Sequence, residues 1–221
     1  MNDLSAVVRI KNREVSANTY LWRTNTPGAC LMIDPGLDRE AIEAALDEHG
    51  LTPSAILCTH GHFDHLGSAE HFRRRYSIPV HLHSADANVA QASNFRMMAL
   101  NLQSRIVVPE VFAFFDEGMT AAGTDGVEIV GVPGHTPGSV VLLFAGYAFT
   151  GDMLYRDDVW RMSWPEEDGE RLVASVRSLW DLLPDETVIY PGHGGAATFG
   201  AIKQRNVPMR RMLGLDEVAT R

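Results

Sequence analysis

The chain has 221 residues, of which 45% are hydrophobic and 21% are charged, so it has enough apolar material for a folded core and wholesale disorder is excluded. Its formal net charge of −9 argues against a nucleic-acid-binding surface, which would show an excess of Lys and Arg. The longest apolar run, at residues 140–145, is far shorter than the roughly 20 residues of a membrane span, and no signal-like segment is visible, so we expect no membrane partner and a cytoplasmic location.

Short apolar runs alternate with helical patterns along the chain. In the first half these patterns predict strands at 6–10, 19–23 and 29–33, a helix at 38–49, a strand at 55–58, a helix at 68–76, and a strand at 80–83 followed by a short helix. In the second half they predict strands at 127–132, 140–144 and 147–150, a helix at 171–183, a strand at 188–190 and a terminal helix at 201–213. The alternation predicts an α/β (α+β) fold, and the lack of a linker predicts one domain over residues 1–221.

The chain has two cysteines, Cys30 and Cys58, and both fall in apolar stretches that are typical of buried strands. Two cysteines supply no disulfide framework. We therefore expect two buried, reduced thiols that pack as small apolar side chains.

A histidine-rich segment at residues 59–67 follows a predicted strand and carries His60, His62, Asp64 and His65. Imidazole nitrogen and carboxylate oxygen are ligands that zinc, iron and manganese share. In an extended segment alternate side chains point to one side, so His60 and His62 can meet one ion. Asp64 and His65 are then placed for a second ion nearby. Taken alone, the segment could also be a solvated loop.

Three further loops each follow a predicted strand and combine glycine with one candidate ligand. These loops supply His135, Asp152 and His193. Each loop alone is typical of a surface turn, but loops at strand ends are also where metal ligands and catalytic residues collect. With the histidine-rich segment, the loops give five histidines and two aspartates, a full ligand set for two metal ions that share one carboxylate.

These motifs resemble those of the metallo-β-lactamase superfamily, and the strand pattern from residue 6 to residue 190 is similar as well. The resemblance implies a four-layer αβ/βα sandwich, in which two mixed β-sheets face each other with helices outside. It also implies two ligand triads that share a bridging Asp152: His60, His62 and His135 for the first ion, and Asp64, His65 and His193 for the second. Asp34 matches a position that supports the ligands in that family, and a simple turn aspartate is the alternative.

Within that superfamily the chain resembles the glyoxalase II (hydroxyacylglutathione hydrolase) group, on the basis of residues 59–65, 133–139, 149–152 and 191–194. The resemblance implies a hydrolase in which a hydroxide bridging two divalent ions attacks the carbonyl carbon of a small-molecule thioester or related ester. Asp64 and Asp152 are the candidate catalytic residues, as ligands that could also pass a proton. Zinc is the first choice for both ions, and iron or manganese would accept the same ligands.

Two other activities of the same scaffold stay open. A persulfide dioxygenase would hold a single iron ion with His60, His135 and Asp152, because two histidines and a carboxylate leave open positions for oxygen chemistry. An acyl-homoserine lactonase would need an apolar pocket beside the metal ions. The segment after Asp152 lacks the glycine-rich pattern of short glyoxalase II-like proteins, so the use of glutathione is also open.

An apolar insert at residues 92–118 follows no clean strand period. We expect a helix plus an irregular segment, placed between two regular parts of the fold. Its side chains could roof the metal cleft, pack on the sandwich or form a homodimer contact. The candidate substrate pocket combines residues of the insert with the segment after Asp152: Phe95, Met98, Phe112, Tyr155, Arg156 and Trp160.

Overall fold

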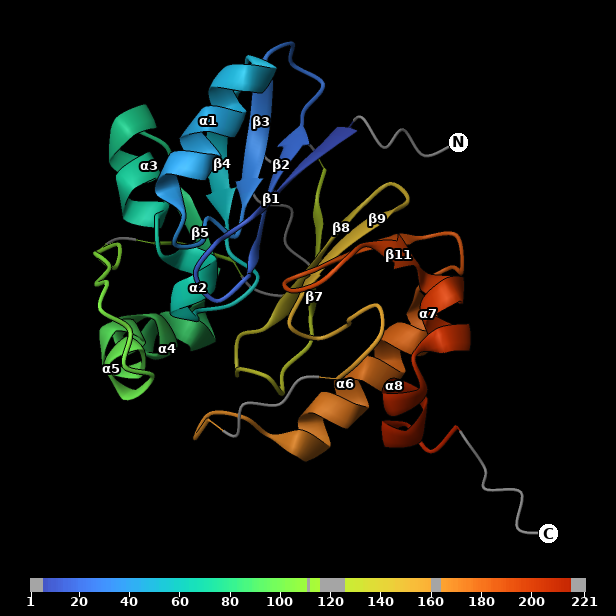
Figure 1. The fold of residues 1–221 in the computed structure, drawn as a ribbon. Helices are drawn as coiled ribbons and strands as arrows, with labels where there is room; N and C mark the ends of the chain where they lie inside the picture. Colours follow the sequence, from blue (N-terminus) through green and yellow to red (C-terminus); the bar gives the residue numbers. More distant parts are fainter. Residues whose placement is uncertain (1–5, 111, 116–125, 160–163, 216–221) are drawn as a thin grey trace, which may run out of the picture.

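The structure is a computed structural model that describes residues 6–110, 112–115, 126–159 and 164–215. Within these residues two mixed β-sheets pack face to face, and helices cover the outer face of each sheet (Figure 1). One group of buried apolar side chains fills the space between the sheets, and one further group lies under the helices on each side. The predicted four-layer αβ/βα sandwich is therefore confirmed.

The first sheet has six strands, whose spatial order follows the sequence. The first three strands pair antiparallel, and the last four pair parallel. Parallel neighbours need crossover connections, and the helices between them supply these crossovers. The strands are β1 (Val7–Lys11), β2 (Asn18–Arg23), β3 (Ala29–Ile33), β4 (Thr52–Leu57), β5 (Val80–His83) and β6 (Ala113–Phe115).

The second sheet has five strands in the order β11-β10-β9-β8-β7. Strands β9 and β10 pair parallel, and the other neighbours pair antiparallel. Its strands are β7 (Glu128–Gly131), β8 (Val140–Phe144), β9 (Tyr147–Gly151), β10 (Val188–Pro191) and β11 (Ala197–Thr198). The second sheet is thus built by the second half of the chain.

The helices fall into three groups. Helices α1 (Arg39–His49) and α3 (Ala69–Tyr76) cover the first sheet, and α6 (Gly169–Leu182), α7 (Phe199–Arg205) and α8 (Val207–Met212) cover the second (Figure 1). The third group lies toward the edge at which β3 and β4 end: α2 (Phe63–Leu66), the 3₁₀ helix η2 (Ser84–Asp86), α4 (Ala87–Gln91) and α5 (Ser93–Ala99). None of the described helices is long and apolar enough to cross a membrane.

The layer between the two sheets is rich in aromatic side chains. Tyr20 and Trp22 of β2 face Phe144 and Phe149 of the second sheet. The ring centroids of Tyr20 and Phe149 lie 5.2 Å apart at a steep angle, and those of Trp22 and Phe144 lie 4.5 Å apart. Such contacts add about 0.5–1.5 kcal/mol per pair beyond the apolar area that they bury. They fix how the two sheets sit on each other.

Three details of the fold differ from the sequence-based prediction. The insert contributes not only helix α5 but also the strand β6, which pairs parallel with β5. The short strand β11 is also new, and the predicted terminal helix is two helices that meet at Asn206. The side chain of Asn206 accepts a hydrogen bond from the backbone N–H of Met209, and this cap starts a new helix. Residues 111 and 116–118 of the insert lie outside the described residues.

Both cysteines are fully buried, as predicted. Burial raises the pKa of the Cys30 thiol to about 12 and that of Cys58 well above its usual range, so almost no reactive thiolate is present at neutral pH. We expect a thiol reagent to modify the native protein at least about 100-fold more slowly than the unfolded protein. Absorbance of the released chromophore measures both rates, and rapid modification of the native protein would contradict this prediction.

Candidate metal centre

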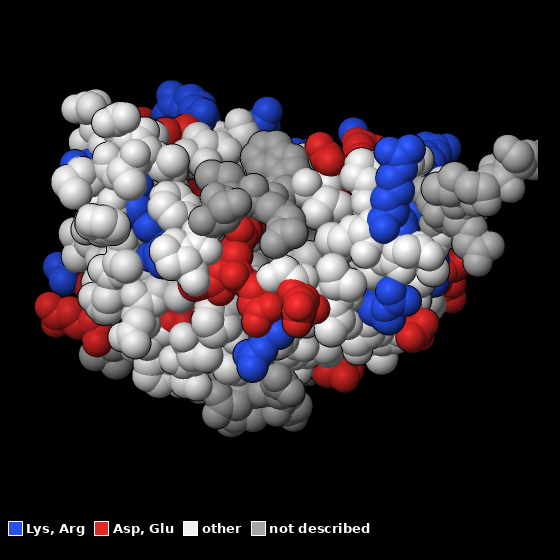
Figure 2. Space-filling view, turned by 90° about the horizontal axis from the view of Figure 1, so that it is seen from below, with Lys and Arg blue, Asp and Glu red and all other residues white. Residues whose placement is uncertain are grey.

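The four loops that carry the predicted ligands meet at one edge of the sandwich. The histidine-rich segment follows β4 of the first sheet, whereas His135, Asp152 and His193 follow β7, β9 and β10 of the second. Side chains from both halves of the fold therefore converge there. Figure 2 shows the molecule from below the view of Figure 1, on the side where β3 and β4 end, with Asp and Glu side chains near the middle of that face. Negative charge at this face attracts cations.

The first ligand cluster consists of three buried histidines. His62 Nδ1 lies 3.1 Å from Nε2 of His60 and 3.0 Å from Nε2 of His135. These three nitrogens lie close enough together to bind one ion. The cluster joins the histidine-rich segment of the first sheet to a loop of the second.

The second cluster consists of Asp64, His65 and His193. Oδ2 of Asp64 lies 3.3 Å from Nε2 of His193 and 3.8 Å from Nε2 of His65. Asp152 faces both clusters: its Oδ1 lies 3.5 Å from Nε2 of His65, and its Oδ2 lies 3.5 Å from Nε2 of His135. All seven predicted ligands thus come together, with Asp152 between the two triads.

The donor atoms at this centre fit two divalent cations. Nε2 of His65 and Oδ1 of Asp152 are buried and make no hydrogen bond within the described part of the chain. Buried polar atoms normally have a hydrogen-bond partner. The 3.5 Å between these two atoms is typical of two ligands that bind one ion. Burial, and then the neighbouring imidazoles, hold the pKa of His60 well below its usual range, so this ring is neutral and can bind a metal at neutral pH.

The family model of the metallo-beta-lactamase superfamily matches residues 12–193. The chain belongs to this superfamily. The resemblance that the motifs predicted is confirmed.

Several known proteins are similar to most of this chain. The probable metallo-hydrolase YqgX of Bacillus subtilis is 33% identical over 183 residues, which cover 81% of this chain and 86% of that protein. The hydroxyacylglutathione hydrolase GloC of Haemophilus influenzae is 31% identical over 184 residues, which cover 79% of this chain and 84% of that protein. The crystal structure of TTHA1623 in a di-iron-bound form has a TM-score of 0.82 and 32% identity, and the match covers 90% of this chain and 98% of that one.

Asp34 supports the centre from a left-handed backbone position (φ 50°) directly after β3. Its carboxylate accepts hydrogen bonds from the backbone N–H and the hydroxyl of Thr59, both at 2.7 Å. The same carboxylate lies 2.9 Å from Nδ1 of His65, and the Thr59 hydroxyl oxygen lies 3.1 Å from Nδ1 of His60. Partners on Nδ1 leave Nε2 of both rings for a metal ion. Asp34 therefore contacts the ligand-bearing segment and is more than a turn residue.

Asp86, which the sequence analysis did not single out, joins two ligand loops from a fully buried position. Its carboxylate accepts hydrogen bonds at 2.7 Å from the backbone N–H groups of Gly61 and Gly138 and from the hydroxyl of Thr136. A β-carbon on Gly61 would lie 2.9 Å from the backbone oxygen of Asp86, and one on Gly138 would lie 2.8 Å from its carboxyl carbon. The two glycines thus allow the loops of His62 and His135 to close around Asp86.

Two more carboxylates were also missed, in the segment just before α6. Glu166 Oε1 lies 2.9 Å from Nε2 of His62, and Glu167 Oε1 lies 3.4 Å from Nδ1 of His135. His62 and Glu166 are 104 positions apart, so no local sequence pattern could have linked them. In the first cluster, two of the three rings thus face a carboxylate with the nitrogen that points away from the cluster.

The His193 loop is held by the first sheet. The Asn18 side chain donates hydrogen bonds to the carbonyl oxygens of Pro191 and Gly194, both at 2.9 Å, and the Tyr20 hydroxyl donates to Pro191 at 2.6 Å. Gly192 leaves room for the centre, since a β-carbon there would lie 2.2 Å from Oδ1 of Asp152. The last ligand is therefore positioned by residues near the start of the chain.

A small hollow opens onto the centre. Besides the ligands His62, Asp64, His135, Asp152 and His193, its walls are Val15, Phe63, Leu100, Tyr155 and Trp164. Tyr155 thus lines this hollow, and Arg156 lines an adjoining hollow with Tyr155 and His193.

The other predicted pocket residues lie elsewhere. Phe95 and Met98 are 67% and 54% exposed and do not line the hollow. Phe112 packs on the apolar group between the first sheet and its helices, because the chain there approaches β5 as β6 begins. The prediction that these three residues line the substrate pocket is therefore wrong for this hollow, and Trp160 lies outside the described residues.

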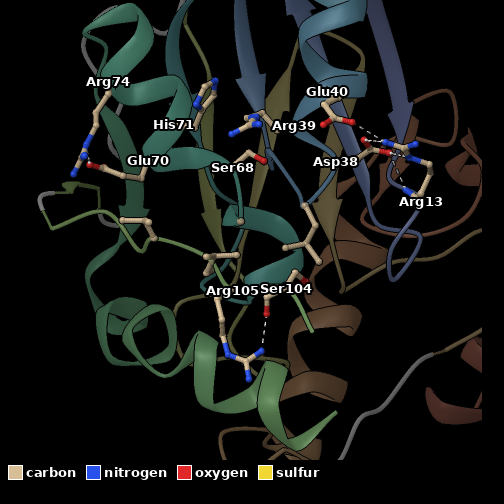
Figure 3. Close-up of a pocket in the computed structure, with 14 residues that line it drawn as sticks. Arg13, Asp38, Arg39, Glu40, Ser68, Glu70, His71, Arg74, Ser104 and Arg105 are labelled. Atoms are coloured by element: carbon tan, nitrogen blue, oxygen red, sulfur yellow. Dashed lines mark hydrogen bonds and ion pairs between the residues drawn. The ribbon is translucent and has the colours of Figure 1, made fainter. Parts of the chain in front are cut away.

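A larger hollow of about 500 Å³ lies between α1, α3 and the insert (Figure 3). It contains several arginines, but Arg13 pairs with Asp38 at 2.7 Å and Arg74 pairs with Glu70. None of the seven candidate ligands, all of which are described, lines it. Size alone therefore does not identify the reaction site in this protein.

Proposed function

We propose that this protein is a dinuclear metal-dependent hydrolase that cleaves a small-molecule thioester or related ester. The observation that carries the proposal is the pair of complete ligand triads with Asp152 facing both. The similarity to the hydroxyacylglutathione hydrolase GloC supports the thioester as substrate class. A cytoplasmic location and a small-molecule partner, without nucleic acid or membrane, belong to the same proposal.

His60, His62 and His135 would hold the first ion, Asp64, His65 and His193 the second, and Asp152 would contact both. When bound, two such ions lower the pKa of a coordinated water toward neutrality and polarise a carbonyl group. Zinc is our first choice, and iron or manganese accept the same imidazole and carboxylate donors.

Residues of the chain itself would orient the substrate. Burial, and then the charge of Asp152, raise the pKa of Tyr155, so its hydroxyl stays protonated in the wall of the hollow. The apolar side chains of Phe63, Leu100 and Trp164 can contact the acyl part and exclude water. Exposed Phe95 and Met98 lie outside the hollow and are available for a homodimer contact.

Metal analysis tests this proposal most directly. We expect about two divalent ions per purified chain, because the two triads share Asp152 and are both complete. Removing the ions with a chelator should abolish hydrolysis of hydroxyacyl thioesters, and adding zinc back should restore it.

Other outcomes favour the alternatives. One iron per chain, with no second ion after excess zinc, would contradict the dinuclear hydrolase and favour a persulfide dioxygenase. Two ions with activity on acyl-homoserine lactones, but not on thioesters, would replace the substrate class and keep the metal centre.

A further inference from the structure

A buried chain of polar contacts leads from the first ligand cluster into the apolar insert. Glu166 Oε1 lies 2.9 Å from Nε2 of His62, and a terminal nitrogen of Arg96 lies 2.6 Å from the same oxygen. The other terminal nitrogen of Arg96 donates to the backbone oxygen of Val89 at 2.7 Å. The side chains of His62, Glu166 and Arg96 are 6%, 11% and 9% exposed, so water competes little for these contacts.

His62 differs from the other rings of its cluster in the ring nitrogen that it directs inward. It presents Nδ1 to the cluster, whereas His60 and His135 present Nε2. A neutral imidazole carries its proton on one nitrogen only, and the acceptor Glu166 favours the proton on Nε2. That tautomer leaves the lone pair of Nδ1 directed into the cluster.

Arg96 holds this arrangement in place and connects it to the wall of the hollow. It compensates the charge of the Glu166 carboxylate, which would otherwise be largely buried without a cation. Its guanidinium carbon also lies 6.0 Å from the ring centroid of Trp164, which lines the hollow at the centre. Since Arg96 belongs to α5, the insert reaches the metal centre through a polar contact as well as through Leu100, which lines the hollow.

We infer that Glu166 and Arg96 are positioning residues, which fix the tautomer and orientation of His62 for the first metal ion and place Trp164 at the hollow. The inference rests on the proposed dinuclear centre but not on the choice of substrate. It also gives the insert a role: its helix α5 is part of the support of the centre.

The test is zinc binding to metal-free protein in competition with a chromophoric chelator, which needs no substrate. We expect Glu166→Ala to weaken the first-site affinity by about 10–100-fold and to leave the second site within about threefold. Glu166→Gln keeps an acceptor oxygen but loses the charge, so it should cost less, about threefold to tenfold. The loss of first-site zinc affinity in Arg96→Met should lie between the losses in these two variants. Arg105→Met, an exposed arginine of the same insert, is the matched control and should bind zinc like the parent protein.

The unfolding midpoint of each metal-free variant separates a positioning role from a purely structural one. A folded Glu166→Ala protein that binds both ions within about threefold of the parent would overturn the inference. If Glu166→Ala does not fold, the zinc affinity of Glu166→Gln is the test. A first-site affinity equal to that of the parent protein in this variant would also overturn the inference. A parent protein that binds two ions but hydrolyses no thioester would contradict only the proposed function, whereas one that binds no zinc would overturn both.

Discussion

Replacing Asp152 by asparagine is expected to lower kcat/KM for thioester hydrolysis by about 1,000-fold. A dinuclear centre stabilises the transition state by several kcal/mol, and each loss of about 1.4 kcal/mol lowers the rate about tenfold. Asparagine keeps the shape of the side chain but puts an NH₂ group where one carboxylate oxygen faces His65 or His135. An NH₂ group donates hydrogen bonds and does not bind cations. Metal content should therefore fall from about two ions per chain to about one.

The Asp152→Asn protein should still fold. Burial and the charge of Asp64 act to raise the pKa of Asp152, but His193, His65 and His135 together hold it below its usual value. The charge therefore stabilises the metal-free fold, and its loss should lower the unfolding midpoint without metal. Asp181→Asn, at an exposed position of α6, is the matched control for loss of one negative charge and should keep full activity. More than a tenth of the parent activity in Asp152→Asn, with two ions bound, would contradict the bridging role.

Replacing Asp86 by alanine is expected to lower the free energy of unfolding by about 3–5 kcal/mol, because two backbone N–H groups and one hydroxyl would lose a charged acceptor. The donors belong to Gly61, Thr136 and Gly138, which lie beside the ligands of the first cluster. For a chain of this size such a loss lowers the melting temperature by roughly 6–20 °C. Denaturant unfolding of the metal-free protein measures the effect without any contribution from metal binding.

A control variant and a second measurement test the role of Asp86 further. Asp47→Ala removes an exposed aspartate of α1 and should change stability by no more than about 0.5 kcal/mol. Asp86→Ala should also weaken the first metal site, since the loops of His62 and His135 lose their common anchor. An unchanged unfolding midpoint would show that Asp86 does not hold these loops together.

Much of the fold could be predicted from local pattern. The helix at α1 has an aspartate cap at Asp38 and a left-handed Gly50 at its end, and both signals are visible in the sequence. Strand β6 could not be predicted, because it is three residues long and acquires its partner β5 only through the tertiary fold. The same holds for β11, a two-residue strand that exists by pairing with β10.

The candidate centre divides in the same way. Metal ligands stand out because few other roles place histidine and aspartate after glycine at strand ends, and all seven predicted ligands do meet. The residues that hydrogen-bond to the ligands or to their loops have no such sequence pattern. Asp86 precedes a short helix and Glu166 lies in a loop, so each looks like an ordinary surface carboxylate in the sequence. Only contacts across 104 positions for Glu166, and 25 and 50 for Asp86, reveal what they hold.

Each half of the sandwich is made by one continuous stretch of chain: β1 to β6 span residues 7–115 and β7 to β11 span residues 128–198. During synthesis, the first sheet can therefore complete its pairings before the second sheet exists. Until the second half arrives, the aromatic face around Tyr20 and Trp22 is exposed to solvent. Docking of the two halves is thus the late and aggregation-sensitive step of folding, and it is also the step that first brings His135, Asp152 and His193 to the other four ligands.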